Sequence, residues 1–255
     1  MLDKEGLSNV GVTPGETTNW FRFSYWGYAD AIAQDSDALN ALGLVTSHGF
    51  YSGHYGRWFG DHRSVGIDLL REKRANLKCW VTSTSWSKMD ADNLKEMHGN
   101  IYSAKVNAII PWACIQRPAK WVGGDPNPGS AFHVDENGHY TVRRGYYYYK
   151  QVCRAGQPGM GVAWTMAMDS EVLIIAFAKN DTKNPDAIIV INISQTNKRV
   201  GITIKGASSR RWYSYRTSDD ETFKYDAAGD MEMDSKERLY VEMPARSAIT
   251  LFSKQ

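Results

Sequence analysis

The sequence predicts an α/β domain of four strand–helix units, half of a (β/α)8 TIM-type barrel, followed by an all-β domain that forms a β-sandwich. Up to about residue 158, short apolar runs with strand-type bulk alternate with segments of helical periodicity. After Gly161 the apolar residues recur at every second position, and turn-forming residues separate the runs. Because eight strand–helix units are needed to close such a barrel, four units leave it open.

The first domain is expected to contain four strands, each ending in a loop. The clearest strand covers residues 78–86, where Cys79, Trp80 and Val81 have strand-type bulk and small hydroxyl residues follow them. The other strands are expected at residues 10–12, 44–51 and 108–115. Ligands of parallel α/β sheets bind beyond the carboxyl ends of the strands, so residues 82–86 should face a substrate.

Helices are expected after these strands, at positions marked by capping residues and helical spacing. Asp35 or Ser36 caps a short helix, and Asp90 or Asp92 begins the helix that follows the third strand. The helices are expected at residues 25–33, 36–42, 61–76, 90–105 and 143–154. An Asn-Gly pair at residues 137–138 predicts a hairpin turn before the last of them.

The second domain is expected to contain about seven strands, a number typical of a β-sandwich. They are predicted at residues 162–167, 172–178, 187–193, 200–204, 211–215, 239–242 and 247–252. The domains are therefore placed at residues 1–158 and 159–255. Since no long linker separates them, the two domains should pack together.

The composition argues against several classes of protein. A formal net charge of +2 over 255 residues gives no large basic field, so no nucleic-acid partner is expected. The chain has no run of about 18 apolar residues, and its first residues, M-L-D-K-E-G, lack the regions of a signal peptide. No membrane association is therefore expected. The three cysteines and six histidines show no ligand spacing, so neither a metal nor a cofactor is expected.

Aromatic residues are abundant, with nine Trp and 14 Tyr, and many lie in polar, glycine-rich surroundings. The tryptophans expected in or beside loops are Trp20, Trp26, Trp58, Trp86 and Trp121. Aromatic faces stack on sugar rings and on nucleic-acid bases, and the nearly neutral charge balance favours sugars. The alternative is that most of these side chains fill a core.

Several short motifs follow one another in a specific order. They are His48 and Tyr51 in an H-x-x-Y segment, W-V-T-S at residues 80–83, Trp112 after an aliphatic run, and residues 146–159, 215–218 and 244–251. In this order they resemble the carboxyl-terminal half of a glycoside hydrolase family 30 enzyme, of the xylanase and glucosylceramidase-like group. The resemblance spans nearly the whole chain and implies that the four strands correspond to strands five to eight of the barrel.

The resemblance implies a sugar-binding cleft whose catalytic groups depart from the family pattern. The family's nucleophile is a Glu at the end of strand seven, where this chain has Ser83, and its acid/base lies in an Asn-Glu-Pro segment that this chain does not contain. A retaining glycosidase uses two carboxyl groups, and an un-ionised serine hydroxyl cannot replace one. Glu16, at the exit of the first strand, is the alternative catalytic carboxylate, and Asp61 and Asp125 are further candidates.

The substrate-binding residues are expected at strand exits and in the loops that follow. They are His48, Tyr51, Trp80, Trp86, Trp112 and Trp121. His48 is expected to donate a hydrogen bond to a sugar hydroxyl, with a structural histidine as the alternative.

Three interpretations of the function remain open. The chain is a glycoside hydrolase-like protein that acts on or binds xylan or β-glucan, or a non-catalytic carbohydrate-binding or structural protein derived from a glycosidase, or a truncation of a longer enzyme. Its expected partners are an oligo- or polysaccharide and, because a half-barrel leaves apolar surface exposed, a second copy or a second half-barrel chain. The family implies a bacterial protein that is secreted or periplasmic, although this chain shows no signal peptide.

Overall fold

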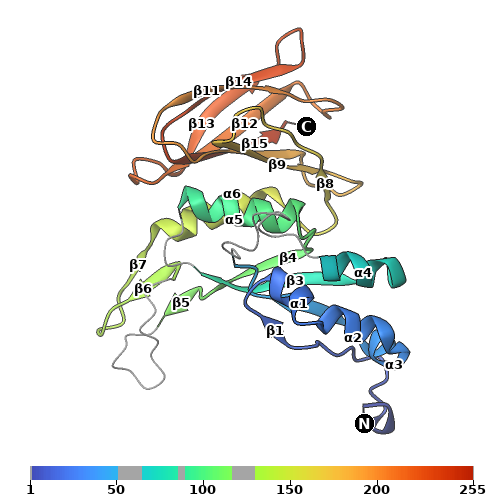
Figure 1. Ribbon diagram of the computed structural model, residues 1–255. Coiled ribbons are helices and arrows are strands. Elements are labelled where there is room, and N and C mark those ends of the chain that lie inside the picture. Colours follow the sequence, from blue (N-terminus) through green and yellow to red (C-terminus); the bar gives the residue numbers. More distant parts are fainter. Residues whose placement is uncertain (1, 51–64, 86–89, 117–129, 255) are drawn as a thin grey trace. The chain divides into compact units, whose positions relative to one another are not determined.

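The computed structural model describes residues 2–50, 65–85, 90–116 and 130–254 of the chain (Figure 1). The chain divides into two compact units. The first unit comprises Met1–Ser85 and Glu96–Ala113, and the second comprises Trp86–Lys95 and Cys114–Gln255.

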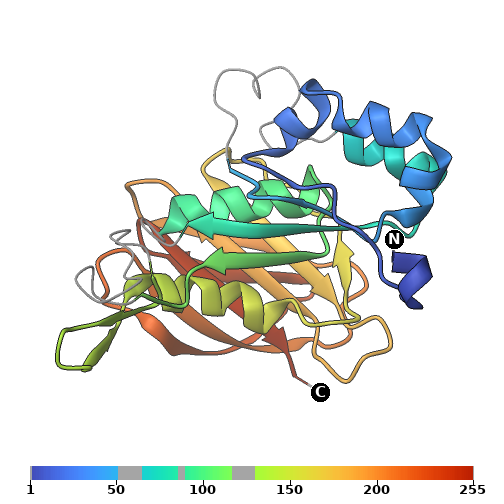
Figure 2. The same ribbon diagram turned by 90° about the horizontal axis from the view of Figure 1, so that it is seen from below.

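The first unit contains a four-stranded sheet in which every pair of neighbouring strands is parallel. Its strands are β1 (Glu16–Thr17), β2 (Leu44–Ser47), β3 (Lys78–Ser85) and β4 (Ala108–Trp112), in that spatial order. Figure 2 shows β3 and β4 running side by side in the same direction. The three strands predicted from bulky apolar runs are present as β2 to β4, although β2 ends at Ser47 and β4 at Trp112, before the predicted ends at residues 51 and 115.

The first strand lies further along the chain than predicted. The expected strand at residues 10–12 is wrong, since only Val12 makes an isolated bridge, to Leu42. The side chains of Val10 and Val12 are about half exposed, whereas Thr17 is buried and pairs with β2. The burial of Thr17, rather than the apolar character of residues 10–12, therefore sets the position of this strand.

Among the described residues, five helices lie wholly or partly in this unit. They are α1 (Trp20–Tyr25), α2 (Tyr28–Gln34), α3 (Ser36–Ala41), α4 (Val65–Lys73) and α5 (Ala91–Tyr102), and a short 3-10 helix covers Leu2–Glu5. The predicted helix at residues 25–33 is wrong in extent, because Gly27 adopts a φ of 76° and separates α1 from α2. The cap of α3 is Asp35, whose carboxylate accepts hydrogen bonds from the amides of Asp37 and Ala38.

The core of the first unit lies between these helices and one face of the sheet. Trp20 and Phe23 of α1 and Leu70 of α4 are fully buried against strand side chains. The strand side chains in this core are Val45, Cys79 and Val81, with Ile109 packed beside them. This face of the sheet is therefore covered by helices.

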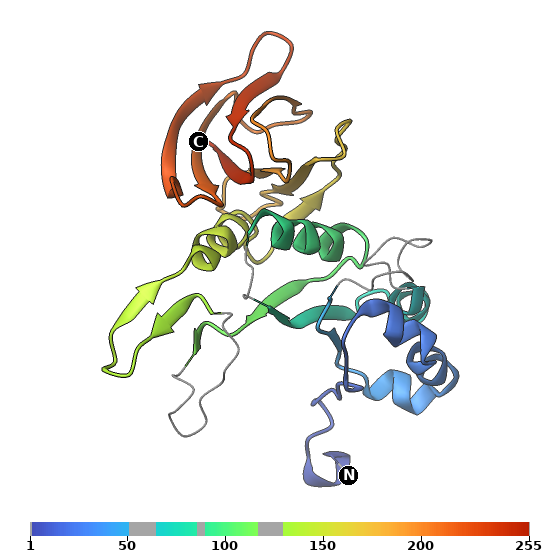
Figure 3. The same cartoon turned by 60° about the vertical axis from the view of Figure 1, so that its left-hand side comes forward.

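The second unit begins with a small sheet and a helix. Its first strands are β5 (Ile115–Gln116), β6 (Phe132–Val134) and β7 (Tyr140–Val142), followed by α6 (Arg144–Ala155). The predicted Asn-Gly turn is confirmed, since β6 and β7 form an antiparallel hairpin and Gly138 adopts a φ of 85° (Figure 3). Helix α6, which was expected to close the first domain, belongs to the second unit. The boundary at residue 158 stays a prediction.

The rest of the second unit is antiparallel β-structure in two sheets. Its strands are β8 (Gly161–Ala163), β9 (Val172–Ala178), β10 (Ala187–Asn192), β11 (Lys198–Thr203), β12 (Arg211–Ser218), β13 (Lys224–Glu232), β14 (Arg238–Met243) and β15 (Ser247–Ser253). Six of them form a sheet in the order β13-β12-β15-β10-β9-β8, and β11 pairs with β14 in a second layer (Figure 1). The side chains of Val190, Trp212 and Val241 are part of a single core supplied by both sheets.

One strand of this unit, β13, was not predicted. Its sequence, K-Y-D-A-A-G-D-M-E, is polar and lacks the period of two. It pairs with β12 alone, at the edge of the sheet, where alternate burial is not required.

An ion-pair cluster in the second unit joins the start of α5 to the loops beside α6. The Arg246 guanidinium contacts the carboxylates of Asp90 at 3.2 Å and Asp219 at 2.8 Å, and all three side chains are mostly buried. The Tyr148 hydroxyl donates to Asp219 at 2.6 Å. Asp90 also caps α5 by accepting hydrogen bonds from the amides of the first turn. Burial raises the pKa of Asp90, and the neighbouring Asp219 acts in the same direction.

Across the four described stretches, every helix is too short or too polar to cross a lipid bilayer.

Candidate functional site

The face of the parallel sheet opposite the helices carries the predicted site residues. Cys79 and Val81 point into the helix-covered core, so Trp80 between them points to the other side. The strand register aligns Trp80 with Thr46, and Thr46 with Glu16, which places all three on this side. Ile110 and Trp112 of β4 follow the same alternation. We call this surface, defined by Glu16, Trp80, Ile110 and Trp112, the open face.

The aromatic side chains of the open face are accessible. Trp80 of β3 is 38% exposed and Trp112 of β4 is 51% exposed. Trp112 ends β4, and its peptide bond to Ala113 is cis. Two accessible indole rings on one sheet face are typical of a surface that stacks against a ligand.

Glu16 lies at the centre of a polar cluster at the carboxyl ends of the strands. Its Oε2 atom is 3.3 Å from Nε2 of His48, which follows β2 directly. Its Oε1 atom accepts a hydrogen bond from the hydroxyl of Thr82 in β3. Three neighbouring strands thus contribute one side chain each, and the carboxylate and imidazole remain about one-third exposed.

The position of His48 is fixed by the turn that follows β2. The His48 amide donates to the carbonyl of Thr17 at 2.9 Å, and its ring lies edge-on to the ring of Phe50. Gly49 adopts a φ of 67°, and a Cβ atom there would lie 2.7 Å from both Asn100 and Val81. This turn therefore requires glycine.

Asn100 of α5 holds the same turn through hydrogen bonds of its side chain. Its Nδ2 atom donates to the Gly49 carbonyl at 3.0 Å, and its Oδ1 atom accepts from the Trp20 indole at 2.8 Å. Asn100 and Trp20 are almost completely buried. Because buried hydrogen bonds of this kind are costly to break, they hold the backbone at His48 in one conformation.

A β-bulge occupies the end of β3 next to Glu16. Val81 pairs with Ile109 and Thr84 pairs with Pro111, so Thr82 and Ser83 together lie opposite the single residue Ile110. Thr84 faces the helices, where its hydroxyl donates to Glu96 at 2.8 Å. Bulges re-aim side chains and are common beside active sites. Ser83, which the resemblance predicts to occupy the family's nucleophile position, is half-buried within this bulge.

The structure brings four predicted site residues onto one face and leaves others outside the described residues. Glu16, His48, Trp80 and Trp112 share the open face, and Ser83 lies in the adjoining bulge. Outside the described residues are Tyr51, Trp86, Trp121, Asp61 and Asp125. The functional roles assigned to all these residues stay predictions.

Sequence reasoning missed the residues that support the cluster. Thr82 was expected to face a ligand, but nothing in the sequence indicated its contact with Glu16. The sequence did not indicate a supporting role for Asn100 either, because an Asn side chain within a helical pattern usually points to solvent. A buried amide on a helix is recognisable as a support only when its partners, Trp20 and Gly49, are known.

The cluster has the chemistry of a sugar-binding site. A carboxylate accepts hydrogen bonds from sugar hydroxyls, an imidazole donates or accepts them, and indole faces stack on sugar rings. Glu16 is one carboxylate, whereas retaining and inverting glycosidases both use two. Within the described ranges no three His, Cys, Asp or Glu side chains are grouped to hold a metal ion.

The fold is similar to part of the fold of glycoside hydrolase family 30 enzymes. The chain superposes on a family 30 endoxylanase from Clostridium papyrosolvens with a TM-score of 0.71 and 19% identity, covering 97% of this chain and 57% of that one. For a family 30 subfamily 8 xylanase from Clostridium acetobutylicum the TM-score is 0.73 and the identity 16%, with the same coverage. An endo-β1,6-glucanase gives a TM-score of 0.61 and 16% identity, over 99% of this chain and 51% of that one.

These similarities concern the fold, and they extend over part of each neighbour. The chain spans about 57% of the length of the two xylanases. No protein-family model and no curated protein matches the sequence. The predicted resemblance to family 30 is confirmed at the level of the fold.

Proposed function

We propose that this chain is a glycoside hydrolase-like protein that binds plant-type polysaccharide, xylan or β-glucan, along the open face of its parallel sheet. The observation that carries the proposal is the contact between Glu16 and His48, on the same face as the accessible rings of Trp80 and Trp112. Sugar-binding sites combine polar groups of this kind with aromatic platforms. The names of the structural neighbours, xylanases and a glucanase, support a glycan as the ligand.

In this proposal the β1–β4 sheet corresponds to strands five to eight of a (β/α)8 barrel, and the two antiparallel sheets correspond to a β-sandwich. The parallel order of the four strands and their helix-covered face support the first correspondence. The face of a barrel sheet that points away from the helices is the barrel interior. The exposure of Ile110 on this face supports pairing with a second copy or with another half-barrel chain, which would leave the carboxyl ends of the strands, with His48 and Trp112, open to a substrate.

We do not expect this chain by itself to hydrolyse glycosides by the family's retaining mechanism. Ser83 occupies the position that the resemblance assigns to the nucleophile, and a hydroxyl is un-ionised at neutral pH. Glu16 supplies one carboxylate to the open face, and a second would have to come from elsewhere. The function proposed is therefore glycan binding without efficient cleavage.

A second candidate function is hydrolysis in which Glu16 acts as the catalytic acid or base. The specific observation in its favour is the His48 imidazole 3.3 Å from the carboxylate, within reach for proton transfer. This second function also requires another carboxylate beside Glu16, because glycosidases use two.

Activity measurements on xylan, β-glucan and nitrophenyl glycosides separate the two candidates. The wild-type chain is expected to cleave none of them efficiently. Ser83→Glu should gain, at most, slow cleavage of nitrophenyl glycosides, because these leaving groups need little help from an acid. Efficient cleavage of xylan by the wild-type chain, abolished in Glu16→Gln, would contradict the first candidate and support the second.

A further inference from the structure

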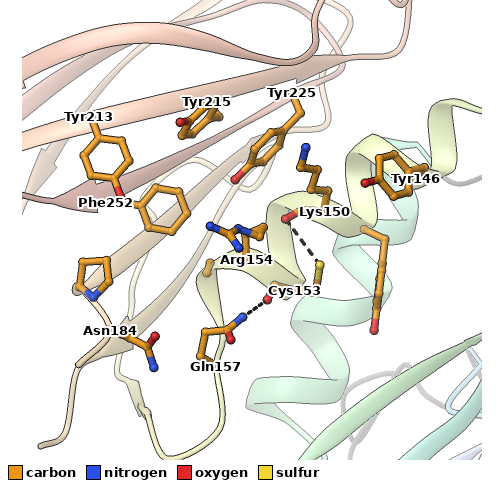
Figure 4. A pocket seen from close by; sticks show the side chains of 13 residues that line it. Tyr146, Lys150, Cys153, Arg154, Gln157, Asn184, Tyr213, Tyr215, Tyr225 and Phe252 are labelled. Carbon is orange, nitrogen blue, oxygen red and sulfur yellow. Dashed lines mark hydrogen bonds between the residues drawn. The ribbon is translucent and has the colours of Figure 1, made fainter. Parts of the chain in front are cut away.

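A pocket of about 650 Å³ lies in the second unit between α6 and the strands β12, β13 and β15 (Figure 4). The open face belongs to the first unit, and the function proposed above makes no use of this pocket. Its volume falls within the range of about 300–1,000 Å³ that is usual for small-molecule sites. The pocket is therefore large enough for a ligand of a few rings.

Aromatic side chains from three strands form one wall of the pocket. The rings of Tyr215 and Tyr225 stack with centroids 4.6 Å apart and nearly parallel planes. Tyr213 stacks in the same way on Phe252, at 5.3 Å. Burial raises the pKa of the Tyr225 hydroxyl to about 12, although Arg154 beside it acts in the opposite direction, so the hydroxyl stays protonated at neutral pH. The wall thus offers flat apolar faces with hydroxyl groups.

Helix α6 supplies two cations to the opposite wall. Lys150 Nζ lies 4.4 Å from the centroid of the Tyr225 ring, and Figure 4 shows Lys150 and Arg154 extending from the helix toward the strand tyrosines. None of the residues lining the pocket is Asp or Glu. Among the described residues, neither cation forms an ion pair with a carboxylate, so within this part of the chain the two positive charges of the pocket are not balanced by a negative one.

The pocket is held in shape by hydrogen bonds between α6 and the strands. The Gln151 side chain donates to the Thr217 hydroxyl at 2.8 Å and accepts from Thr250. Tyr148, on the same buried side of the helix, donates to Asp219. A site that is preorganised in this way loses less conformational entropy when a ligand binds.

We propose that this pocket binds an acidic saccharide, a short oligosaccharide whose uronate carboxylates pair with Lys150 and Arg154 while its rings lie against Tyr213 and Tyr225. Carboxylates form charge-assisted hydrogen bonds with ammonium and guanidinium groups, and these bonds are stronger than neutral ones. The tyrosine faces suit the apolar faces of sugar rings. The requirement for a carboxylate follows from the pocket itself, whereas the choice of a saccharide rests on the proposed function.

Isothermal titration calorimetry with trigalacturonate, and with galactotriose as its neutral counterpart, tests the proposal. Trigalacturonate should bind the wild-type chain at least about tenfold more tightly than galactotriose, as expected for the loss of one charge-assisted hydrogen bond. Lys150→Gln and Arg154→Gln should each weaken trigalacturonate binding by about tenfold. The matched control is Lys205→Gln, which removes an exposed cation outside the pocket and should leave the affinity unchanged.

Three results would overturn the proposal. The first is equal affinity for the acidic and neutral trisaccharides, and the second is unchanged affinity in both pocket variants. The third is displacement of trigalacturonate by an equal concentration of inorganic phosphate, which would indicate an unspecific anion-binding site. Absence of any binding would also reject it. None of these results would affect binding of neutral xylo-oligosaccharides at the open face, so the two proposals fail separately.

Discussion

The Glu16 carboxylate of β1 lies 3.3 Å from the imidazole of His48, which follows β2, and both side chains remain about one-third exposed. Pairs exposed to this extent contribute little to stability, in general less than about 1 kcal/mol. Their contact is thus better explained by ligand binding than by folding.

A double-mutant cycle of Glu16→Gln and His48→Ala separates these roles. We expect a coupling energy below about 1 kcal/mol in urea unfolding. The affinity of each single variant for xylo-oligosaccharides should fall by about tenfold, because a hydrogen-bonding partner of the sugar is removed. A coupling above about 2 kcal/mol with unchanged sugar affinity would assign the pair a structural role.

Gly49→Ala should destabilise the first unit severely. The new Cβ would lie 2.7 Å from both Asn100 and Val81, at a backbone conformation that already disfavours alanine. The matched control is Gly15→Ala, which has a φ of 94° but no heavy atom within 4 Å of its Cβ. The control should lose roughly 1–2 kcal/mol from backbone strain, and Gly49→Ala roughly 1–3 kcal/mol more from overpacking. Equal losses in urea unfolding would show that the turn adapts without cost.

The elements that the sequence predicted correctly depend on local signals. Residues 78–85 have the bulk of a buried strand, Asp35 is a side-chain cap, and Asn137 with Gly138 is a hairpin turn, so each is recognisable within a few residues. The family 30-like fold was indicated separately, by the order of the short motifs from His48 and Tyr51 to residues 244–251.

The features that the sequence did not predict depend on distant partners. Glu16 is in a strand because Thr46 of β2 pairs with it, and β13 is a strand because β12 pairs with it, although neither segment has strand-type composition. The contact between Glu16 and Thr82 joins residues far apart in the sequence, so no local pattern indicates it. The site residues were predictable as separate strand-end side chains, whereas their arrangement required the sheet register.

The three thiols should react with iodoacetamide in an order set by burial. Cys114 is exposed, Cys153 is half-buried with a pKa raised by burial, and Cys79 is fully buried with a pKa raised to about 11. A raised pKa lowers the reactive thiolate fraction near pH 8, so Cys114 should be modified first and Cys79 last. Peptide mass spectrometry at successive times measures this order. Modification of Cys79 as fast as Cys114 would show that the core of the first unit opens readily.

The central claim is that the open face binds glycan, and calorimetric titration of xylo- and β-gluco-oligosaccharides against Trp112→Ala tests it most directly. Trp164→Ala is the matched control, because Trp164 is 80% exposed and belongs to the other unit. The account predicts that Trp112→Ala weakens binding by roughly 1–3 kcal/mol, the contribution of an aromatic contact, whereas the control leaves it unchanged. Titration curves for Trp112→Ala that superpose on those of the wild-type chain would contradict the account.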